Sequence, residues 1–282
     1  MTDVLRPRRS VLYLPANRES AVVKARTLAV DCVILDLEDA VQPAAKDAAR
    51  EAAAAAMQAG GWGGREMLLR ANGLGTAWAG ADLAMAKAAG FGAVVVPKVD
   101  SADEAARAVE MAGGLPVWAM IETPRGVLDA PAIARVPGVV ALLAGMADLA
   151  KDLRARPDGA RTPLLYSLSA IVVAARAAGV MCFDGVFTDI GDAAGFEAEA
   201  RQSVMLGFDG KTLIHPSQVA ACNAVFSPSA EDVVEAEGLI AAYEAGLASG
   251  VGVTTFRGKM VEVLHVEEAR RVLGLAGASP VN

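Results

Sequence analysis

The chain has 282 residues, of which 54% are hydrophobic, and its formal net charge is −7. This negative charge argues against nucleic acid as the main partner, and no apolar run reaches the roughly 20 residues needed to cross a bilayer. The charged N-terminal segment leads into no apolar stretch with a cleavage site, so secretion is not expected. Cys32, Cys182 and Cys222 lie far apart and form no C-x-x-C pair. We therefore expect a reduced, cytoplasmic protein whose thiols are small core residues.

Short apolar segments alternate with alanine-rich helical segments over most of the chain. Each apolar segment is typical of a strand buried on both faces. The expected strands are 10–16, 32–38, 66–72, 93–99, 116–122, 139–145, 181–190 and 211–216. The expected helices are 18–29, 43–58, 77–89, 102–112, 125–134, a short one near Asp148, 163–178, 193–206 and 217–226.

This alternation predicts an α/β fold, a (β/α)₈ TIM barrel over residues 1–227. An open doubly wound sheet is the alternative, but the usual glycine-rich phosphate loop does not follow the first strand. From Pro228 the pattern changes to a long helix, begun by Ser227 or Ser229 and ended by Gly250, then an extended segment and a last helix. We expect residues 228–282 to form a helical appendage that could act as a lid.

Charged side chains follow the strands, where a TIM barrel places its chemistry. In chain order they are Asp36, Glu38 and Asp39, Arg70 with Asn72, Lys98, Glu122, Asp148, and Asp184 with Asp189. Carboxylates gathered at one rim repel one another unless a cation neutralises them. The chain has only two histidines, so a metal ion here would have oxygen ligands, as Mg²⁺ or Mn²⁺ does.

The same residues also have structural interpretations. Glu122 and Asp148 could each cap the helix that follows, and Arg70 could pair with the acids after the second strand. For Lys98, the sequence favours neither a structural nor a functional role. His215 fits a structural group at the end of the last strand better than a catalyst. The joint pattern is therefore more informative than any one of these residues.

Eight motifs then follow one another along nearly the whole chain. They are RSVLYLPANRE, DCVILDLEDAV, LLRANGLGT, VVVPKV, AMIETPRG, LAGMADLAKDL, GFDGKTLIHPSQV and GKMVEVLHVEEARRVL. In this order they resemble the citrate lyase β-subunit-like family, the acyl-CoA lyases of the HpcH/HpaI aldolase superfamily. The resemblance implies a TIM barrel that assembles as a homotrimer or a multiple of trimers, and a small-molecule acyl-CoA substrate.

The resemblance also implies roles for particular residues. Glu122 and Asp148 would hold Mg²⁺, with Mn²⁺ as the other candidate, and Arg70 would contact the substrate. From the residues themselves, we expect Asp36, Glu38 and Asp39 to hold metal-bound waters or to orient Arg70 and Lys98, which places Lys98 beside the metal ligands. Backbone N–H groups of Gly145, Met146 and Ala147, at the start of a helix, could hold a substrate carboxylate. Ala147 departs from relatives that often carry an acid at this position.

Two further regions are assigned by the resemblance. Arg18 and Lys24 lie where the family contacts the phosphates of CoA, although both could be ordinary exposed charges. Glu262 in GKMVE stands at the place of a tail aspartate that the family contributes to a neighbouring subunit. We expect Glu262 to manage the proton of the enolate, with a solvated surface glutamate as the alternative.

The expected substrate is a 3-hydroxy-acyl-CoA whose hydroxylated carbon carries a carboxylate, such as malyl-CoA or citramalyl-CoA. Chelation by Mg²⁺ acidifies the hydroxyl, and cleavage gives a 2-oxo acid and acetyl-CoA. Two alternatives stay open. One is a class II pyruvate-enolate aldolase, which usually has metal-binding histidines. The other is a non-catalytic or acyl-carrier-dependent citrate lyase-type subunit, against which the long appendage argues. The sequence does not tell whether a thioesterase step follows the cleavage.

Overall fold

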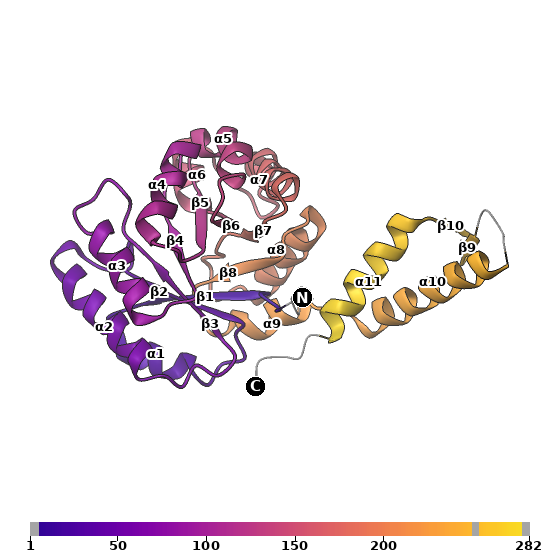
Figure 1. Ribbon diagram of the computed structural model, residues 1–282, viewed down its shortest axis with the longest axis horizontal. Coiled ribbons are helices and arrows are strands. Elements are labelled where there is room, and N and C mark those ends of the chain that lie inside the picture. The colour runs from indigo at the N-terminus through magenta and orange to yellow at the C-terminus, as the bar shows by residue number, and fades with distance from the viewer. Residues whose placement is uncertain (1–5, 250–253, 278–282) are drawn as a thin grey trace. The chain divides into compact units, whose positions relative to one another are not determined.

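The computed structural model describes residues 6–249 and 254–277, and its strands form a closed barrel (Figure 1). Each of the eight strands pairs in parallel with the next, and the last pairs with the first. The strands are β1 (Ser10–Pro15), β2 (Cys32–Asp36), β3 (Glu66–Arg70), β4 (Ala93–Val96), β5 (Val117–Ile121), β6 (Val139–Ala144), β7 (Met181–Asp184) and β8 (Gly210–Leu213). The predicted (β/α)₈ barrel is confirmed, and closure excludes the open doubly wound sheet.

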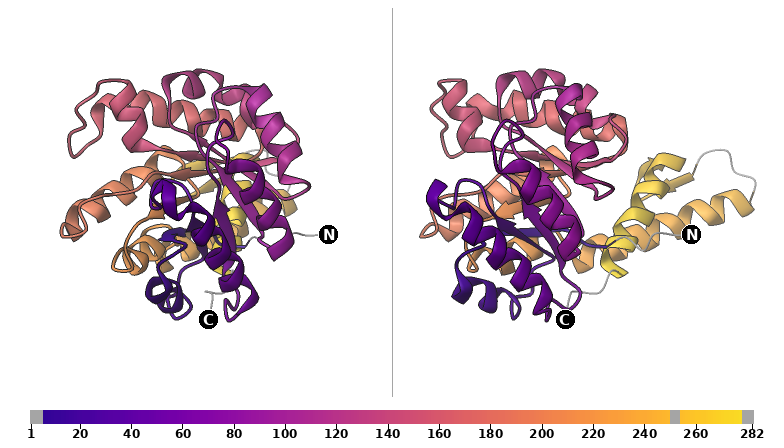
Figure 2. Two further views of the ribbon diagram at one scale, coloured as in Figure 1. Left: turned by 90° about the vertical axis from the view of Figure 1, so that its left-hand side faces the viewer. Right: turned by 60° about the vertical axis from the view of Figure 1, so that its left-hand side comes forward.

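Helices cover the outside of the strands (Figures 1 and 2). They are α1 (Glu19–Ala25), η1 (Pro43–Ala45), α2 (Lys46–Gln58), α3 (Ala79–Ala89), α4 (Ala102–Ala112), α5 (Pro124–Ala134), α6 (Met146–Asp152), η2 (Thr162–Leu164), α7 (Leu165–Ala178), α8 (Ala193–Leu206) and α9 (Gln218–Val225). None of the helices in the described ranges has the length and apolar character that a membrane crossing requires.

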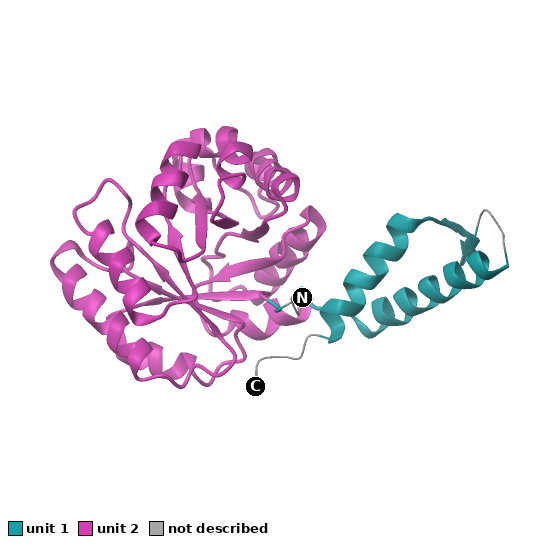
Figure 3. Ribbon diagram, in the orientation of Figure 1, with its two compact units in different colours: residues 1–7, 225–280 teal, residues 8–224, 281–282 magenta. Residues whose placement is uncertain are grey.

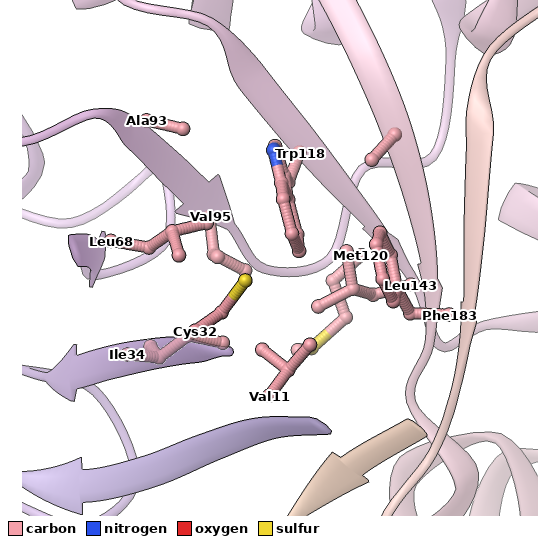
Figure 4. Close-up of a cluster of buried hydrophobic side chains, with 11 residues drawn as sticks. Val11, Cys32, Ile34, Leu68, Ala93, Val95, Trp118, Met120, Leu143 and Phe183 are labelled. Carbon is pink, nitrogen blue, oxygen red and sulfur yellow. The ribbon is translucent and has the colours of Figure 1, made fainter. Parts of the chain in front are cut away.

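Large apolar side chains fill the inside of the barrel (Figure 4). Trp118 of β5 stacks on Phe183 of β7 with ring centroids 4.5 Å apart, and Cys32 lies in the same cluster. All three cysteines are buried and none forms a disulfide, which confirms them as core residues. Burial raises the pKa of the Cys222 thiol to about 12 and also raises that of Cys182, so neither is a reactive thiolate.

Helix α1 and strand β7 end four or more residues before their predicted ends. Helix α1 ends at Ala25, where Arg26 and Thr27 turn back onto the carbonyls of Val23 and Lys24. Strand β7 ends at Asp184, because the Asp184 side chain accepts the next backbone N–H and the chain then leaves the sheet. The predicted strand up to residue 190 is therefore wrong beyond this point.

The chain divides into two compact units (Figure 3). Of the described residues, the barrel unit contains Arg8–Ala224, and the second unit contains 6–7, 225–249 and 254–277. The second unit contains α10 (Ala230–Ala248), the antiparallel strands β9 (Thr254–Phe256) and β10 (Lys259–Val261), and α11 (Val263–Gly277).

Local chemistry explains the elements of the second unit. Ser229 and Asp232 form a reciprocal capping box at the start of α10. Arg257 and Gly258 both have positive φ, the conformation that a two-residue hairpin turn between β9 and β10 requires. The predicted helix end at Gly250 lies outside the described residues.

Candidate active site

A buried guanidinium–carboxylate pair joins the carboxyl ends of β2 and β3. Arg70 donates from Nε and Nη2 to the two oxygens of Asp36 at 2.7 and 2.6 Å, and Asp36 is 1% exposed. Asp36 also accepts the backbone N–H groups of Glu38 and Ala40. Burial opposes the charge of Arg70, but its bonds to Asp36 outweigh this and raise the guanidinium pKa. Arg70 is therefore held in one orientation as a cation.

Lys98 extends this network to β5 and α6. Arg70 Nη1 lies 3.0 Å from Glu38 Oε2, and Lys98 Nζ lies 3.3 Å from Glu38 Oε1 and 2.9 Å from Asp148 Oδ2. The backbone N–H of Lys98 donates to Glu122 Oε1 at 2.8 Å. Burial opposes the ammonium, yet these acids, Asp148 first, raise its pKa. The structure thus brings six predicted residues into one rim network: Asp36, Glu38, Arg70, Lys98, Glu122 and Asp148.

Asp39, the remaining acid after β2, takes little part in this network. Its carboxylate is largely exposed and lies 4.0 Å from Arg70 Nη1. Glu38 is the better placed of the two acids, since it contacts both Arg70 and Lys98. Burial raises the pKa of Glu38 despite these cations.

Glu122 is buried directly after β5, and burial raises its pKa to about 7. It packs against Gly145, where any side chain would meet Glu122, since a Cβ would lie 2.5 Å from Oε2. The cap of α5 is Thr123, which accepts the N–H of Gly126. The N-cap residue of α6 is Gly145, and no side chain caps this helix. The interpretations of Glu122 and Asp148 as helix caps are therefore wrong.

Tyr13 of β1 is a site residue that sequence reasoning missed. The guanidinium carbon of Arg70 lies 4.9 Å from the centroid of its ring, a cation–π contact. Its hydroxyl is buried and has no hydrogen-bond partner within the described part of the chain, and burial raises its pKa. The available signal was the alternation in SVLYLP, which places Tyr13 on the same strand face as Val11.

Lys46, at the start of α2, was also missed. It is 6% exposed, and its Nζ donates to the carbonyls of Leu37 and Glu38 at 2.7 Å each. It also lies over the ring of Trp78. Lys46 therefore holds the turn that carries Glu38. No local pattern marks such a contact, because its acceptors are backbone atoms.

Asp184 and Asp189 do not join the rim network, contrary to the sequence prediction. Asp184 is fully buried and bonds to Lys211 Nζ at 2.9 Å, to Arg161 Nη1 at 2.7 Å and to Ser203. Burial would raise the pKa of Asp184, but Lys211 and Arg161 hold it below its usual value. Asp189 is exposed in the loop after β7. The Asp184 cluster is a buried ion network with a structural role.

Asn72, Arg18 and Lys24 also lie apart from the network of Arg70 and Lys98. Asn72 bonds to Asp82, which is also paired with Arg50. Arg18 and Lys24 are exposed at the start and end of α1.

The remaining predicted residues lie on α6, after β8 and in the second unit. Met146 and Ala147 open α6, whereas the N–H of Gly145 is already donated to Ile121. His215 is exposed and bonds to its neighbour Ser217. Glu262 is exposed in the second unit, where its backbone N–H donates to His265.

The donor set at the rim fits a hard cation that keeps water ligands. The described residues contain no group of three or more His, Cys, Asp or Glu side chains arranged to hold a metal. Glu122 and Asp148 supply two carboxylates, and ions such as Mg²⁺ are bound through one or two carboxylates plus waters and substrate oxygens. Burial raises the pKa of Glu122, whereas the positive charge of Lys98 lowers it. A divalent cation would add to that positive charge.

Comparisons with known proteins agree with this geometry. A model of the HpcH/HpaI aldolase/citrate lyase family matches residues 9–216, and one described as a C-C bond lyase of the TIM-barrel fold matches residues 159–279. The chain is 42% identical to a (3S)-malyl-CoA thioesterase of Cereibacter sphaeroides, over 99% of this chain and 98% of that protein. It is 35% identical to citrate lyase subunit beta of Leuconostoc mesenteroides, over 97% and 95% respectively.

One solved structure adds bound molecules to the comparison. Protein CitE from Mycobacterium tuberculosis, in complex with magnesium, acetoacetate and coenzyme A, is 33% identical with a TM-score of 0.82. The match covers 97% of this chain and 99% of that chain.

Proposed function

The chain belongs to the HpcH/HpaI aldolase/citrate lyase family, and from this premise we propose a Mg²⁺-dependent carbon–carbon lyase. Its substrate is a short 3-hydroxy-dicarboxyl-CoA thioester such as malyl-CoA or citramalyl-CoA, cleaved into a 2-oxo acid and acetyl-CoA. The observation that carries the proposal is the linked set of Glu122, Lys98 and Asp148 beside an oriented Arg70. Magnesium and coenzyme A in the related CitE complex support it.

Each rim residue has a task in this reaction. Glu122 and Asp148 hold the metal ion, which when bound polarises the hydroxyl and carboxylate oxygens of the substrate. Arg70 carries more N–H groups than its contacts with Asp36 and Glu38 use, so it keeps donors for the oxygen that gains charge as the bond breaks. Asp36 and Glu38 keep the guanidinium plane in place.

The substrate's other groups are assigned to the surrounding elements. Backbone N–H groups of Met146 and Ala147 face its carboxylate, and Gly145 contributes the space that Glu122 needs. Arg18, just before α1, and Lys24, on α1, contact the CoA phosphates.

The reaction assay separates two products of the same substrate. With malyl-CoA and Mg²⁺, a lyase gives glyoxylate, which phenylhydrazine traps, and acetyl-CoA, which has no free thiol. Hydrolysis of the thioester, the second candidate, is favoured by the 42% identity to a malyl-CoA thioesterase. It gives malate and a CoA thiol that a disulfide reagent detects.

We expect phenylhydrazone to form in step with acetyl-CoA, to stop with chelator and to return with Mg²⁺ or Mn²⁺. Thiol release without any 2-oxo acid would favour the thioesterase instead. No product from malyl-CoA or citramalyl-CoA would point to a subunit that depends on an acyl carrier. The appendage does not argue against that role, since the citrate lyase subunit matches 97% of this chain.

We also propose that the protein is a homotrimer, or a multiple of trimers, and that Glu262 completes the site of a neighbouring subunit as the acid for the enolate. Closed cyclic assemblies allow such sharing. The support is the position of Glu262 on an exposed segment before α11, together with the family's known pattern of a tail acid at this place.

Mixing two inactive variants tests the shared site. Glu262→Ala and Asp148→Asn should each be inactive, and co-refolding them should restore part of the activity. Asp148 is the better partner because Arg70→Ala would leave the buried Asp36 carboxylate unpaired, which is strongly destabilising. Subunit exchange is verified by mass spectrometry of differently tagged chains. A fully active Glu262→Ala protein, or a mixed trimer without activity, would contradict shared sites.

A further inference from the structure

Lys98 contacts both acids that the proposed function assigns to the metal ion. Its Nζ lies 2.9 Å from Asp148 Oδ2, and its backbone N–H donates to Glu122 Oε1 at 2.8 Å. Its φ is +53°, a left-handed conformation that residues other than glycine rarely adopt. The contacts at its two ends offset this backbone cost and fix the position of the ammonium.

The ion pairs around Lys98 leave its ammonium to neutralise mainly Asp148. Arg70, the other cation of the rim network, is already paired with Asp36 and Glu38. Among the ion pairs of the described residues, Lys98 is the cation that neutralises Asp148. Its Nζ also reaches Glu38 at 3.3 Å, so it has a second carboxylate on which it can stay.

We propose that the ammonium of Lys98 is an internal competitor of the metal ion. It pairs with Asp148 while the site holds no metal, which keeps the acids together, and it leaves Asp148 for Glu38 when Asp148 becomes a ligand. This inference rests on the proposed function, from which the metal ion comes. Lys98 therefore lowers the affinity for the cation while stabilising the metal-free rim.

The test measures metal binding directly, without turnover. Titration calorimetry with MgCl₂ compares the parent protein, Lys98→Met and Lys98→Arg. Lys151→Met serves as the control, since Lys151 is an exposed cation on the same helix as Asp148. We expect Lys98→Met to bind Mg²⁺ at least about tenfold more tightly, because it removes a like charge next to the cation. The Mg²⁺ affinities of Lys98→Arg and Lys151→Met should stay close to that of the parent protein.

Thermal unfolding gives the second measurement. Without metal, Lys98→Met should melt at a lower temperature than the parent, and saturating Mg²⁺ should raise its Tm by more than it raises the parent's. If Lys98→Met does not fold, Lys98→Gln removes the same charge while keeping a polar group for Asp148, and the same two results are expected of it.

The outcomes separate this inference from the function on which it rests. A parent protein that binds no Mg²⁺ by calorimetry would overturn the proposed metal site itself. A parent that binds Mg²⁺, with Lys98→Met binding equally or more weakly, would overturn the role of Lys98 alone. Tighter binding in both Lys98→Met and Lys151→Met would also overturn it, because the effect would then be general charge removal.

Discussion

Glu122→Gln should abolish turnover while the protein keeps its fold. The amide retains an oxygen that can accept the N–H of Lys98 and fits the same space beside Gly145, but it is a much weaker ligand for Mg²⁺. Loss of an outer partner of a metal ligand typically costs about 10–100-fold, so loss of a direct ligand should cost more. Activity on malyl-CoA and Mg²⁺ binding by calorimetry are the two measurements.

The fold should not suffer from this change. Burial already disfavours the charged form of Glu122, and a neutral amide avoids burying that charge. The Tm of the metal-free variant should therefore equal or exceed the parent's. Glu110→Gln, an exposed position on α4, controls for the loss of one carboxylate. Full lyase activity in Glu122→Gln would show that Glu122 does not hold the metal.

Arg70→Lys should lower kcat by about a hundredfold or more, comparable to the loss of an oxyanion-hole donor. Lysine keeps the charge but cannot make the two parallel bonds to Asp36 or present a flat guanidinium over Tyr13. KM should change much less, since the lost interaction belongs to the transition state. Steady-state kinetics with saturating Mg²⁺ separates the two constants.

The matched control is Arg176→Lys. Arg176 also makes two bonds to one carboxylate, that of Asp209, but it lies on α7, outside the rim network. Its substitution should remove a similar two-bond contact between a guanidinium and a carboxylate without affecting kcat. An Arg70→Lys enzyme with nearly normal kcat and a raised KM would indicate that Arg70 binds substrate and transition state equally.

Much of the fold and part of the site were predictable from local sequence. The alternation of apolar strands with alanine-rich helices predicted a parallel sheet covered on both faces. The eight strand–helix units, with no glycine-rich phosphate loop after the first strand, favoured the closed barrel. Since parallel strands end at one rim, charged residues placed just after a strand were expected to meet. Asp36 and Arg70 do so as register partners, and Lys98 contacts Glu122 and Asp148.

The sequence did not show which way the side chain at the end of each strand points. Asp36 and Asp184 both end apolar strands, yet Asp36 contacts Arg70 at the rim, whereas Asp184 contacts Lys211, Arg161 and Ser203 in a separate buried cluster. In a strand that is apolar on both faces, the alternation does not tell which face is inside. Only the barrel's register decided which of these acids could belong to the site.

The sequence by itself determined the order of the strands, the family and the residue types available at the rim. Tertiary structure alone decided the partners: Arg70 over Tyr13, Lys46 on the carbonyls of the turn with Glu38, and Lys98 between two carboxylates. The physical reason is the distance along the chain over which each interaction acts. Hydrophobic alternation acts between neighbours in the chain. The contacts of Arg70 and Lys98 instead join residues from different strands and helices, and that of Lys46 depends on how the turn after β2 folds back.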